Sequence, residues 1–331
     1  MAFNLHGKNL MTVRDWSNEE VKHVLNLSRV LKEQRYTGAS QDVMGRKKNI
    51  AVIMQKDSTR TRSAFEVAAY DLGMNVTYIG GTGSQMGKKE SIADTAQVLS
   101  GFYDGIALRC GAHSDVETLG EYASVPVWNA LSDDFHPTQM FADYLTILEE
   151  FNRTDIKFAY FGDARNNMGN SLMLMAAHMG AEFWGIAPKS LWPEKSLIKE
   201  AEEIAKITGA TINFTEDVNE GAKNAHVIYT DVWVSMGEPD EVWEERIKLL
   251  TPYRVTQDIM NITTPNSIFM HCLPAFHDLD TVVGKEINEK FGIDCMEVTD
   301  EVFKSEKSRV MKEAENRMHT IKAIMLATMG Y

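Results

Sequence analysis

Residues 58–62, Ser-Thr-Arg-Thr-Arg, combine hydroxyl and guanidinium groups directly after an apolar run at 50–54. A strand that breaks into a helix start at such residues favours anion binding, because the first backbone N–H groups of a helix have no partner within it and carry the positive end of its dipole. Arg60 and Arg62 add planar forks that match phosphate oxygens. An ordinary capped helix with surface arginines is the alternative, and this segment alone does not decide between the two.

Other predicted strands are also followed by polar residues. A histidine can polarise a carbonyl oxygen, an amide both donates and accepts hydrogen bonds, and a carboxylate four residues before a hydroxyl suits a ligand with an amine and a carboxylate. Each residue also has a plainer reading, as a surface arginine, a helix cap, an Asx turn or a buried small thiol. The motifs are Arg109, His136 to Gln139, Asn166-Asn167, Asp231 to Gly237, and His271-Cys272-Leu273-Pro274.

Several familiar motifs are absent. The glycines of 162–170 lack the Gly-x-Gly-x-x-Gly spacing of a dinucleotide site, and those of 81–89 lack the spacing and the Ser/Thr of a P-loop. No Gly-x-Ser-x-Gly elbow indicates a hydrolase. Cys110 with His113, or Cys272 with His271 and His277, supplies no convincing four-ligand zinc set. We therefore expect no metal and no cofactor.

The composition is that of an ordinary globular protein long enough for two domains, with 331 residues, 44% hydrophobic and 24% charged. A formal net charge of −13 argues against a nucleic-acid partner, which would need a basic face. No apolar stretch approaches the roughly 20 residues of a membrane span. The three cysteines form no disulfide framework, and the first residues resemble neither a signal nor a transit peptide. These features predict a cytoplasmic protein.

Apolar runs alternate with helical patterns, which predicts parallel α/β construction. A capping box at Ser17 and Glu20 starts the first helix, and polar residues 152–155 are the best candidate for a hinge. We predict two doubly wound parallel-sheet domains with a cleft between them, with ligands at the carboxyl ends of the strands. Predicted strands lie at 50–55, 75–79, 105–109, 125–128, 156–161, 182–186, 210–214, 226–230 and 267–270, and predicted helices include 61–72, 91–101, 114–123, 137–150 and 308–329.

Taken together, four segments resemble those of the ornithine carbamoyltransferases: Ser58 to Arg62, His136 to Gln139, Asp231 to Gly237, and His271 to Pro274. The first is typical of carbamoyltransferases broadly, aspartate transcarbamoylase included, whereas the last two are typical of the ornithine branch. The resemblance extends from about residue 45 to the stretch 315–319, and none of the motif positions departs from the family pattern.

The resemblance implies transfer of the carbamoyl group of carbamoyl phosphate to L-ornithine, in a homotrimer or a multiple of trimers and without a cofactor. Residues 1–150 would bind carbamoyl phosphate and residues 151–307 ornithine, while a last helix at about 308–331 crosses back to the first domain. Catalytic roles fall to Cys272, Asp231, Arg109 and His136. The implied carbamoyl phosphate ligands are Ser58, Thr59, Arg60, Thr61, Gln85 (near a subunit boundary), Arg109, His136, Gln139, Cys272, Leu273 and Arg317, and the implied ornithine ligands are Asn167, Asp231, Ser235 and Met236.

Related activities fit the motifs less well. A putrescine carbamoyltransferase has no substrate carboxylate to recognise and should not keep the loop from Asp231 to Gly237, and aspartate transcarbamoylase should lack His271 to Pro274. An inactive paralogue acting as a binding subunit should have lost its arginine or cysteine positions, and none is lost. The same residues serve citrulline synthesis and its reverse, so the direction stays open.

Overall fold

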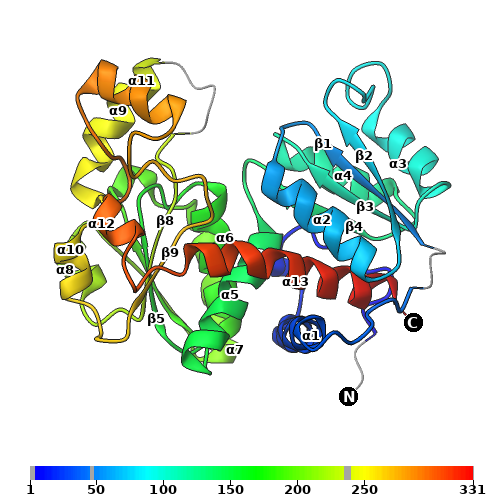
Figure 1. The fold of residues 1–331 in the computed structure, drawn as a ribbon, viewed down its shortest axis with the longest axis horizontal. Coiled ribbons are helices and arrows are strands. Elements are labelled where there is room, and N and C mark those ends of the chain that lie inside the picture. The colour runs from blue at the N-terminus through cyan, green and yellow to red at the C-terminus, as the bar shows by residue number, and fades with distance from the viewer. Residues whose placement is uncertain (1–3, 45–47, 235–239, 331) are drawn as a thin grey trace. The chain divides into compact units, whose positions relative to one another are not determined.

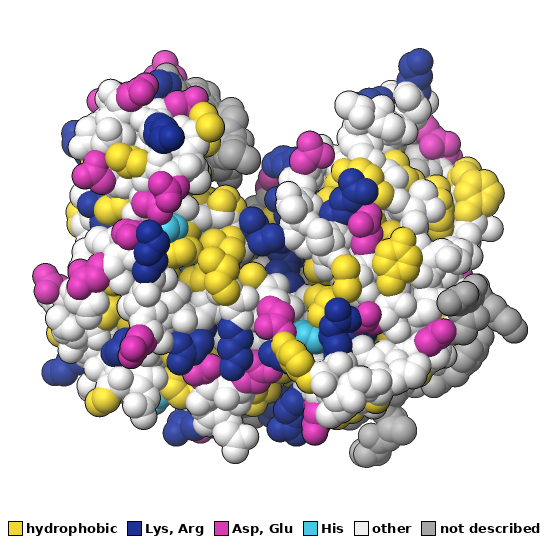
Figure 2. Space-filling model, viewed as in Figure 1, with side chains coloured by type: hydrophobic (Ala, Val, Ile, Leu, Met, Phe, Trp, Pro, Cys, Tyr) yellow, Lys and Arg dark blue, Asp and Glu magenta, His cyan; other side chains and the backbone are white. Residues whose placement is uncertain are grey.

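The computed structural model describes residues 4–44, 48–234 and 240–330 (Figure 1). The chain forms two compact units, one of residues 1–149 together with 314–331 and one of residues 150–313. Every helix among the described residues is too short or too polar to cross a membrane. On the face drawn in Figure 2, lysines and arginines are interspersed with acidic side chains over the surface of each unit.

The first unit is built on a parallel sheet with the strand order β2-β1-β3-β4. β1 and β3 are almost wholly buried, as expected of parallel strands covered on both faces. Helix α2 packs on β1 and β2, while α3 and α4 pack on β3 and β4. The elements are α1 (Asn18–Tyr36), β1 (Asn49–Met54), α2 (Thr59–Asp71), β2 (Asn75–Gly80), α3 (Ile92–Ser100), β3 (Gly105–Arg109), α4 (His113–Tyr122), β4 (Val127–Leu131) and α5 (Pro137–Phe151).

The second unit is built on a five-stranded parallel sheet with the order β7-β6-β5-β8-β9. Its centre is aromatic, since Phe158 stacks on both Phe183 and Tyr229. The elements are β5 (Lys157–Phe161), α6 (Asn167–Met179), β6 (Glu182–Ile186), α7 (Lys195–Thr208), β7 (Thr211–Thr215), α8 (Val218–Ala222), β8 (Val227–Thr230), α9 (Asp240–Leu250), α10 (Gln257–Asn261), β9 (Ile268–Met270), α11 (Val282–Phe291) and α12 (Asp300–Phe303). Helix α13 (Val310–Met329) begins in this unit and continues into the first.

The order of strands reverses once in each sheet. In the first sheet the reversal lies between β1 and β3, and in the second between β5 and β8. Loops that leave two neighbouring strands in opposite directions open a crevice at their carboxyl ends, which is where open α/β sheets bind ligands. The polar motifs at Ser58, Arg109, Gly162 and Asp231 follow these four strands.

The predicted two-sheet parallel α/β architecture is confirmed, and each predicted strand overlaps an observed one. The boundaries of β4 were predicted too early, at 125–128 instead of Val127–Leu131. Pro126 has no N–H to donate, so regular pairing begins after it and continues to Leu131, whose carbonyl accepts the Cys110 N–H. The return of the last helix is also confirmed, because α13 belongs to the first unit from Ala314 onward.

Candidate functional site

The N-terminus of α2 carries the candidate site of the first unit. Ser58 is the N-cap in extended conformation, and its hydroxyl accepts the Thr61 N–H at 3.2 Å. Thr61 is buried, and its Oγ1 accepts a hydrogen bond from Arg317 Nη2 at 2.9 Å. Arg317 lies on α13, 256 residues away in sequence. The fold therefore brings a second guanidinium, that of Arg317, to the helix start where the sequence already places Arg60.

His136, which precedes α5, lies among three arginines. Burial shifts its pKa well below the ordinary value, and the positive charges of Arg317, Arg109 and Arg60 add to the shift in that order. Three guanidinium groups, from α13, the end of β3 and the start of α2, thus act on one buried imidazole. The imidazole is neutral at pH 7, and the positive field that keeps it so suits a phosphate beside it.

Gln139 lies in the first turn of α5 and is fully buried. Its Nε2 donates to Asp143 Oδ1 at 2.8 Å, which fixes the orientation of the amide. Asp143 is itself fully buried. The carbonyl end of the Gln139 amide is therefore directed by a neighbour on the same helix, one turn further on.

Arg62 does not join this arginine cluster. Its guanidinium lies over the Tyr78 ring, 3.9 Å from the centroid, and its Nε pairs with Glu66 at 2.9 Å. The interpretation that both arginines of 58–62 offer forks to a phosphate was wrong for Arg62. Successive helix residues are turned by about 100°, so side chains two apart point to nearly opposite faces.

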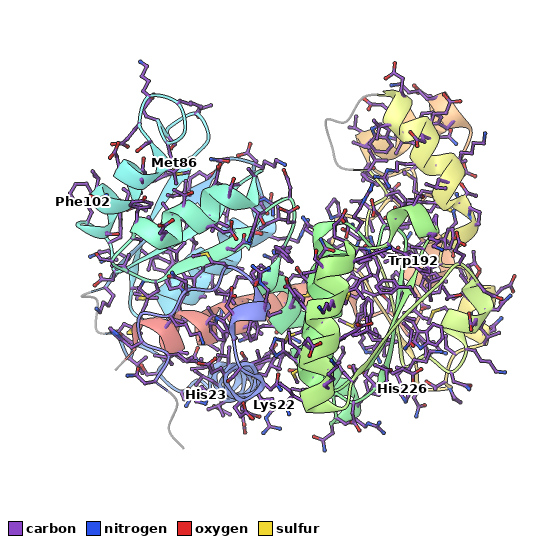
Figure 3. The ribbon with its side chains drawn as sticks, turned by 180° about the vertical axis from the view of Figure 1, so that it is seen from behind. Lys22, His23, Met86, Phe102, Trp192 and His226 are labelled. Carbon is purple, nitrogen blue, oxygen red and sulfur yellow. The ribbon has the colours of Figure 1, made fainter. Side chains whose placement is uncertain are left out.

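Gln85 lies in the turn 81–90, and its side chain is exposed. Its carbonyl accepts the N–H groups of Lys88 and Lys89. Met86, labelled in Figure 3, is buried in the same core cluster as Leu108 and anchors the turn to the first unit. The turn thus presents Gln85 to the outside of its own unit.

Asp231, directly after β8, is the centre of the candidate site in the second unit. Its Oδ1 accepts the Val232 N–H at 2.8 Å and the Cys272 thiol at 3.1 Å, while Oδ2 lies 3.4 Å from Asn166 Nδ2. Burial raises the pKa of Asp231, although His271 and the two hydrogen bonds to Oδ1 oppose the shift. A buried carboxylate with a raised pKa attracts a cation or accepts a proton.

The turn from β5 to α6 supports Asp231. Asn166 caps α6 by accepting the Gly169 N–H at 2.7 Å, and it also accepts the Tyr160 hydroxyl at 3.2 Å. A Cβ on Gly169 would lie 2.3 Å from the Ala164 carbonyl oxygen, so only glycine allows this close packing. Asn166 is thus engaged as a helix cap and as a partner of Asp231, whereas Asn167 begins α6.

The segment that carries Cys272 and Leu273 is held by a buried imidazole. His271 Nδ1 accepts the Leu273 N–H at 2.9 Å, and its Nε2 lies 3.2 Å from Glu297 Oε1. The same Glu297 oxygen accepts the Phe276 N–H at 2.6 Å. Leu273 adopts a φ of 61°, uncommon for a branched side chain, so these hydrogen bonds hold a costly backbone conformation.

Two groups of described residues place three metal-binding atoms within 4.8 Å of one another. In the group of Asp231, His271 and Cys272, both ring nitrogens of the histidine already have partners. In the group of His277, Asp278 and Asp300, the Lys304 ammonium lies 2.8 Å from Asp300 and 3.5 Å from Asp278. A metal at either place would have to displace these interactions.

The pairing of Cys110 and His113 weighed from sequence is also a poor zinc site. The Cys110 thiol donates to the Ala112 carbonyl, and burial raises its pKa to about 12, which disfavours the thiolate that zinc binds. His113 Nδ1 lies 2.8 Å from Ser132 Oγ.

Of the predicted ornithine ligands, Ser235 and Met236 lie outside the described residues.

Comparisons with known proteins match each half of the chain to a domain of one family. Residues 8–149 match the aspartate/ornithine carbamoyltransferase carbamoyl-P binding domain, and residues 154–328 match the Asp/Orn binding domain. The chain is 55% identical to proteins named "Ornithine carbamoyltransferase 1, catabolic" from Staphylococcus epidermidis, over 330 residues, and Streptococcus agalactiae, over 331 residues, with 99% of each chain covered. Among solved structures, the ornithine carbamoyltransferase from Pyrococcus furiosus is similar with a TM-score of 0.91, 39% identity and 99% of both chains covered. That from Gloeobacter violaceus has a TM-score of 0.82 at 33% identity, covering 98% of this chain and 99% of that one.

Proposed function

Since this chain belongs to the aspartate/ornithine carbamoyltransferase family, we propose that it transfers the carbamoyl group of carbamoyl phosphate to the δ-amine of L-ornithine, giving L-citrulline and phosphate. The observation that carries the proposal is the set of three guanidinium groups around the buried His136, in the unit that matches the carbamoyl-P binding domain. The high identity to relatives named catabolic supports the reverse reaction, phosphorolysis of citrulline, as the physiological direction.

The arginines would hold the phosphate of carbamoyl phosphate. Charge grows on the phosphate oxygens as the bond to the carbamoyl carbon breaks, and preorganised guanidinium and hydroxyl donors stabilise that charge. His136, as a neutral imidazole, and Gln139 would bind the carbamoyl oxygen and amide. The phosphate ligands in this proposal are Ser58, Thr59, Arg60, Thr61, Arg109 and Arg317, with Gln85 reaching the site of a neighbouring subunit.

In the second unit, Asp231 would receive the ornithine amine. That amine resembles lysine, with a solution pKa of about 10.4, so presenting it neutral at pH 7 costs about 4.6 kcal/mol. Because burial raises the pKa of Asp231, its carboxylate is disposed to accept the ammonium proton, and Oδ2 is the oxygen not bound by Val232 and Cys272. Asn167, Ser235 and Met236 would bind the rest of ornithine, while Cys272 and Leu273 lie at the reacting centre.

The transfer then needs no covalent enzyme intermediate. The neutral nitrogen forms a bond to the carbamoyl carbon, the tetrahedral intermediate collapses, and the carbon–oxygen bond to phosphate breaks. The second proton lost by the nitrogen leaves with the phosphate. Substrate amine is itself the nucleophile, so the kinetics are sequential, not ping-pong.

The assembly in this proposal is a homotrimer or a multiple of trimers, in the cytoplasm. Large apolar side chains are exposed on the first unit at Val67, Tyr70, Val98 and Phe102, which supports burial against further copies. All three cysteines are free, as suits a reducing compartment. Light scattering after size exclusion tests the assembly.

An amine-specificity assay tests the activity. Carbamoyl phosphate is offered with ornithine, putrescine, lysine or aspartate, and the carbamoylated product and phosphate are measured. We expect kcat/KM for ornithine to exceed the others by at least about 10²-fold. Putrescine lacks the carboxylate and leaves polar groups of the site unpaired, the extra methylene of lysine misplaces its side-chain amine, and aspartate has no side-chain amine to offer. Preference for putrescine would refute the ornithine assignment, and no transfer to any amine would indicate an inactive paralogue.

A further inference from the structure

Glu313 is a fully buried carboxylate with no place in the chemistry described above. It lies in the first turn of α13, where the helix dipole favours a negative charge. Its Oε1 accepts the Tyr229 hydroxyl at 2.8 Å, and its Oε2 accepts the His271 N–H at 3.0 Å. Taking a carboxylate out of water costs free energy, and the two hydrogen bonds offset part of that cost. A carboxylate kept at a buried position therefore requires an explanation.

The His271 N–H belongs to the backbone directly before Cys272. Glu313 therefore fixes the residue at which β9 ends and the segment with Cys272 and Leu273 begins. On the other side of that segment, Glu297 holds the His271 ring and the Phe276 N–H. The Cys272 segment is thus bounded by two buried carboxylates, one before it and one after it.

Glu313 and Arg317 are four residues apart on one helix. They lie on the same side of α13, about one turn and roughly 6 Å apart along its axis. Glu313 is the last residue of the second unit, and its partners lie in that unit. Arg317 belongs to the first unit, where it donates to Thr61 and where its neighbour Asn316 donates to Thr146 at 2.9 Å.

We propose that Glu313 is a positioning residue for carbamoyl transfer: it ties the backbone that carries Cys272 to the helix that carries Arg317. The inference rests on the proposed function, because it uses the roles given there to Cys272 and Arg317. Glu313 touches neither substrate. Its carboxylate fixes the backbone from which the Cys272 thiol and the Leu273 side chain extend.

Three variants separate this role from a merely structural one. Glu313→Gln keeps the length and can offer its oxygen to His271 N–H and its amide hydrogen to the Tyr229 hydroxyl. Glu313→Asp keeps the charge but is too short to serve both partners. Tyr229→Phe is the matched control, since it removes the other hydrogen bond to Glu313 and leaves the one to His271.

The readouts are kcat, KM for ornithine, the Kd of inorganic phosphate, and the rate at which iodoacetamide alkylates Cys272. For Glu313→Asp we expect kcat to fall at least about 10-fold, because the shorter side chain loses one of two hydrogen bonds to a charged group, which are stronger than neutral ones, and the Cys272 backbone then shifts. Cys272 alkylation should change at least threefold, and phosphate affinity should stay within twofold because Arg317 keeps its own contacts. Glu313→Gln and Tyr229→Phe should stay within about threefold of the parent in kcat.

A Glu313→Asp protein with a lower Tm but parental kcat and Cys272 alkylation, measured well below that Tm, would overturn the proposal and leave Glu313 a structural residue. If Glu313→Asp does not fold, the other two variants decide. A tenfold loss of kcat in Tyr229→Phe, with the kcat of Glu313→Gln equal to that of the parent, would also overturn the proposal. Cys272 alkylation does not depend on turnover, so failure of the parent protein to carbamoylate ornithine would be a separate result that refutes the proposed function.

Discussion

Arg60 and Arg62 stand two residues apart and are expected to differ sharply in importance. Arg60 acts on the buried His136 together with Arg109 and Arg317. Arg62 lies over Tyr78 and pairs with Glu66 on the opposite side of α2. Alanine at position 60 removes a charge-assisted fork from the phosphate, whereas alanine at position 62 removes an exposed stacking contact.

The size of the Arg60→Ala effect follows from electrostatics. Two unit charges about 4 Å apart interact by about 4 kcal/mol at the effective dielectric near a protein surface, which sets an upper limit of about 10³-fold in rate. Losing one donor from an oxyanion site costs about 10²- to 10³-fold. Arg109 and Arg317 remain and share the charge, so we expect a loss in kcat/KM of about 10²-fold, near the lower end.

The assay is steady-state carbamoyl transfer to ornithine with varied carbamoyl phosphate, together with phosphate binding by calorimetry. Arg62→Ala should keep kcat/KM within about threefold, because exposed ion pairs contribute little. Both variants are compared at equal oligomeric state by size exclusion, since Arg62 is at the surface. Near-parental turnover in Arg60→Ala, or an equal loss in a correctly assembled Arg62→Ala, would refute the assignment of the phosphate site.

Three further predictions concern the second unit and the cysteines. Burial raises the folded-state pKa of Asp231, so the folded protein loses stability as pH rises through the window between the unfolded and folded pKa values. Asp231→Asn should therefore raise Tm at pH 8, lose that advantage towards pH 4, and weaken ornithine handling. A Tm gain that persists at pH 4 would contradict the reasoning. Cys272→Ser should keep measurable activity with intersecting initial-rate patterns, whereas parallel lines or a trapped carbamoyl thioester would make Cys272 a covalent nucleophile. Iodoacetamide at pH 8 should modify Cys272 more slowly with both substrate sites filled and should spare Cys110, whose burial raises its pKa to about 12; peptide mass spectrometry reads both sites.

The fold was predictable from sequence because parallel strands covered on both faces are continuous apolar runs. β1 and β3 show this, and so the predicted strands at 50–55 and 105–109 coincide closely with Asn49–Met54 and Gly105–Arg109. The error at β4 came from counting Pro126 as a strand residue. The position of the motifs after strands was equally readable, since ligand-binding residues of such sheets gather where strands end.

The orientation of Arg62 was also within reach of the sequence. A segment read as a helix start carries the 3.6-residue period, and that period separates the side chains of Arg60 and Arg62 by about 200°. Reading both as one phosphate fork ignored the period. Asn166 is a similar case, because an asparagine directly before a helix is the preferred N-cap, and it caps α6 by accepting the Gly169 N–H.

The supporting residues were out of reach for a physical reason. A lone glutamate in a helical pattern is assigned to the surface, because glutamate is almost never fully buried unless it is paired. Glu313 and Glu297 are both fully buried. Each binds a backbone N–H and a side chain whose identity depends on packing between segments far apart in the chain. Nothing near Glu313 in the sequence distinguishes it from Glu315. Glu315 lies two residues further along the same helix, on nearly the opposite face, and its side chain is 43% exposed. The residues that we propose to contact substrate can therefore be predicted from motifs, whereas the residues that hold those motifs in place become visible only when the chain is folded.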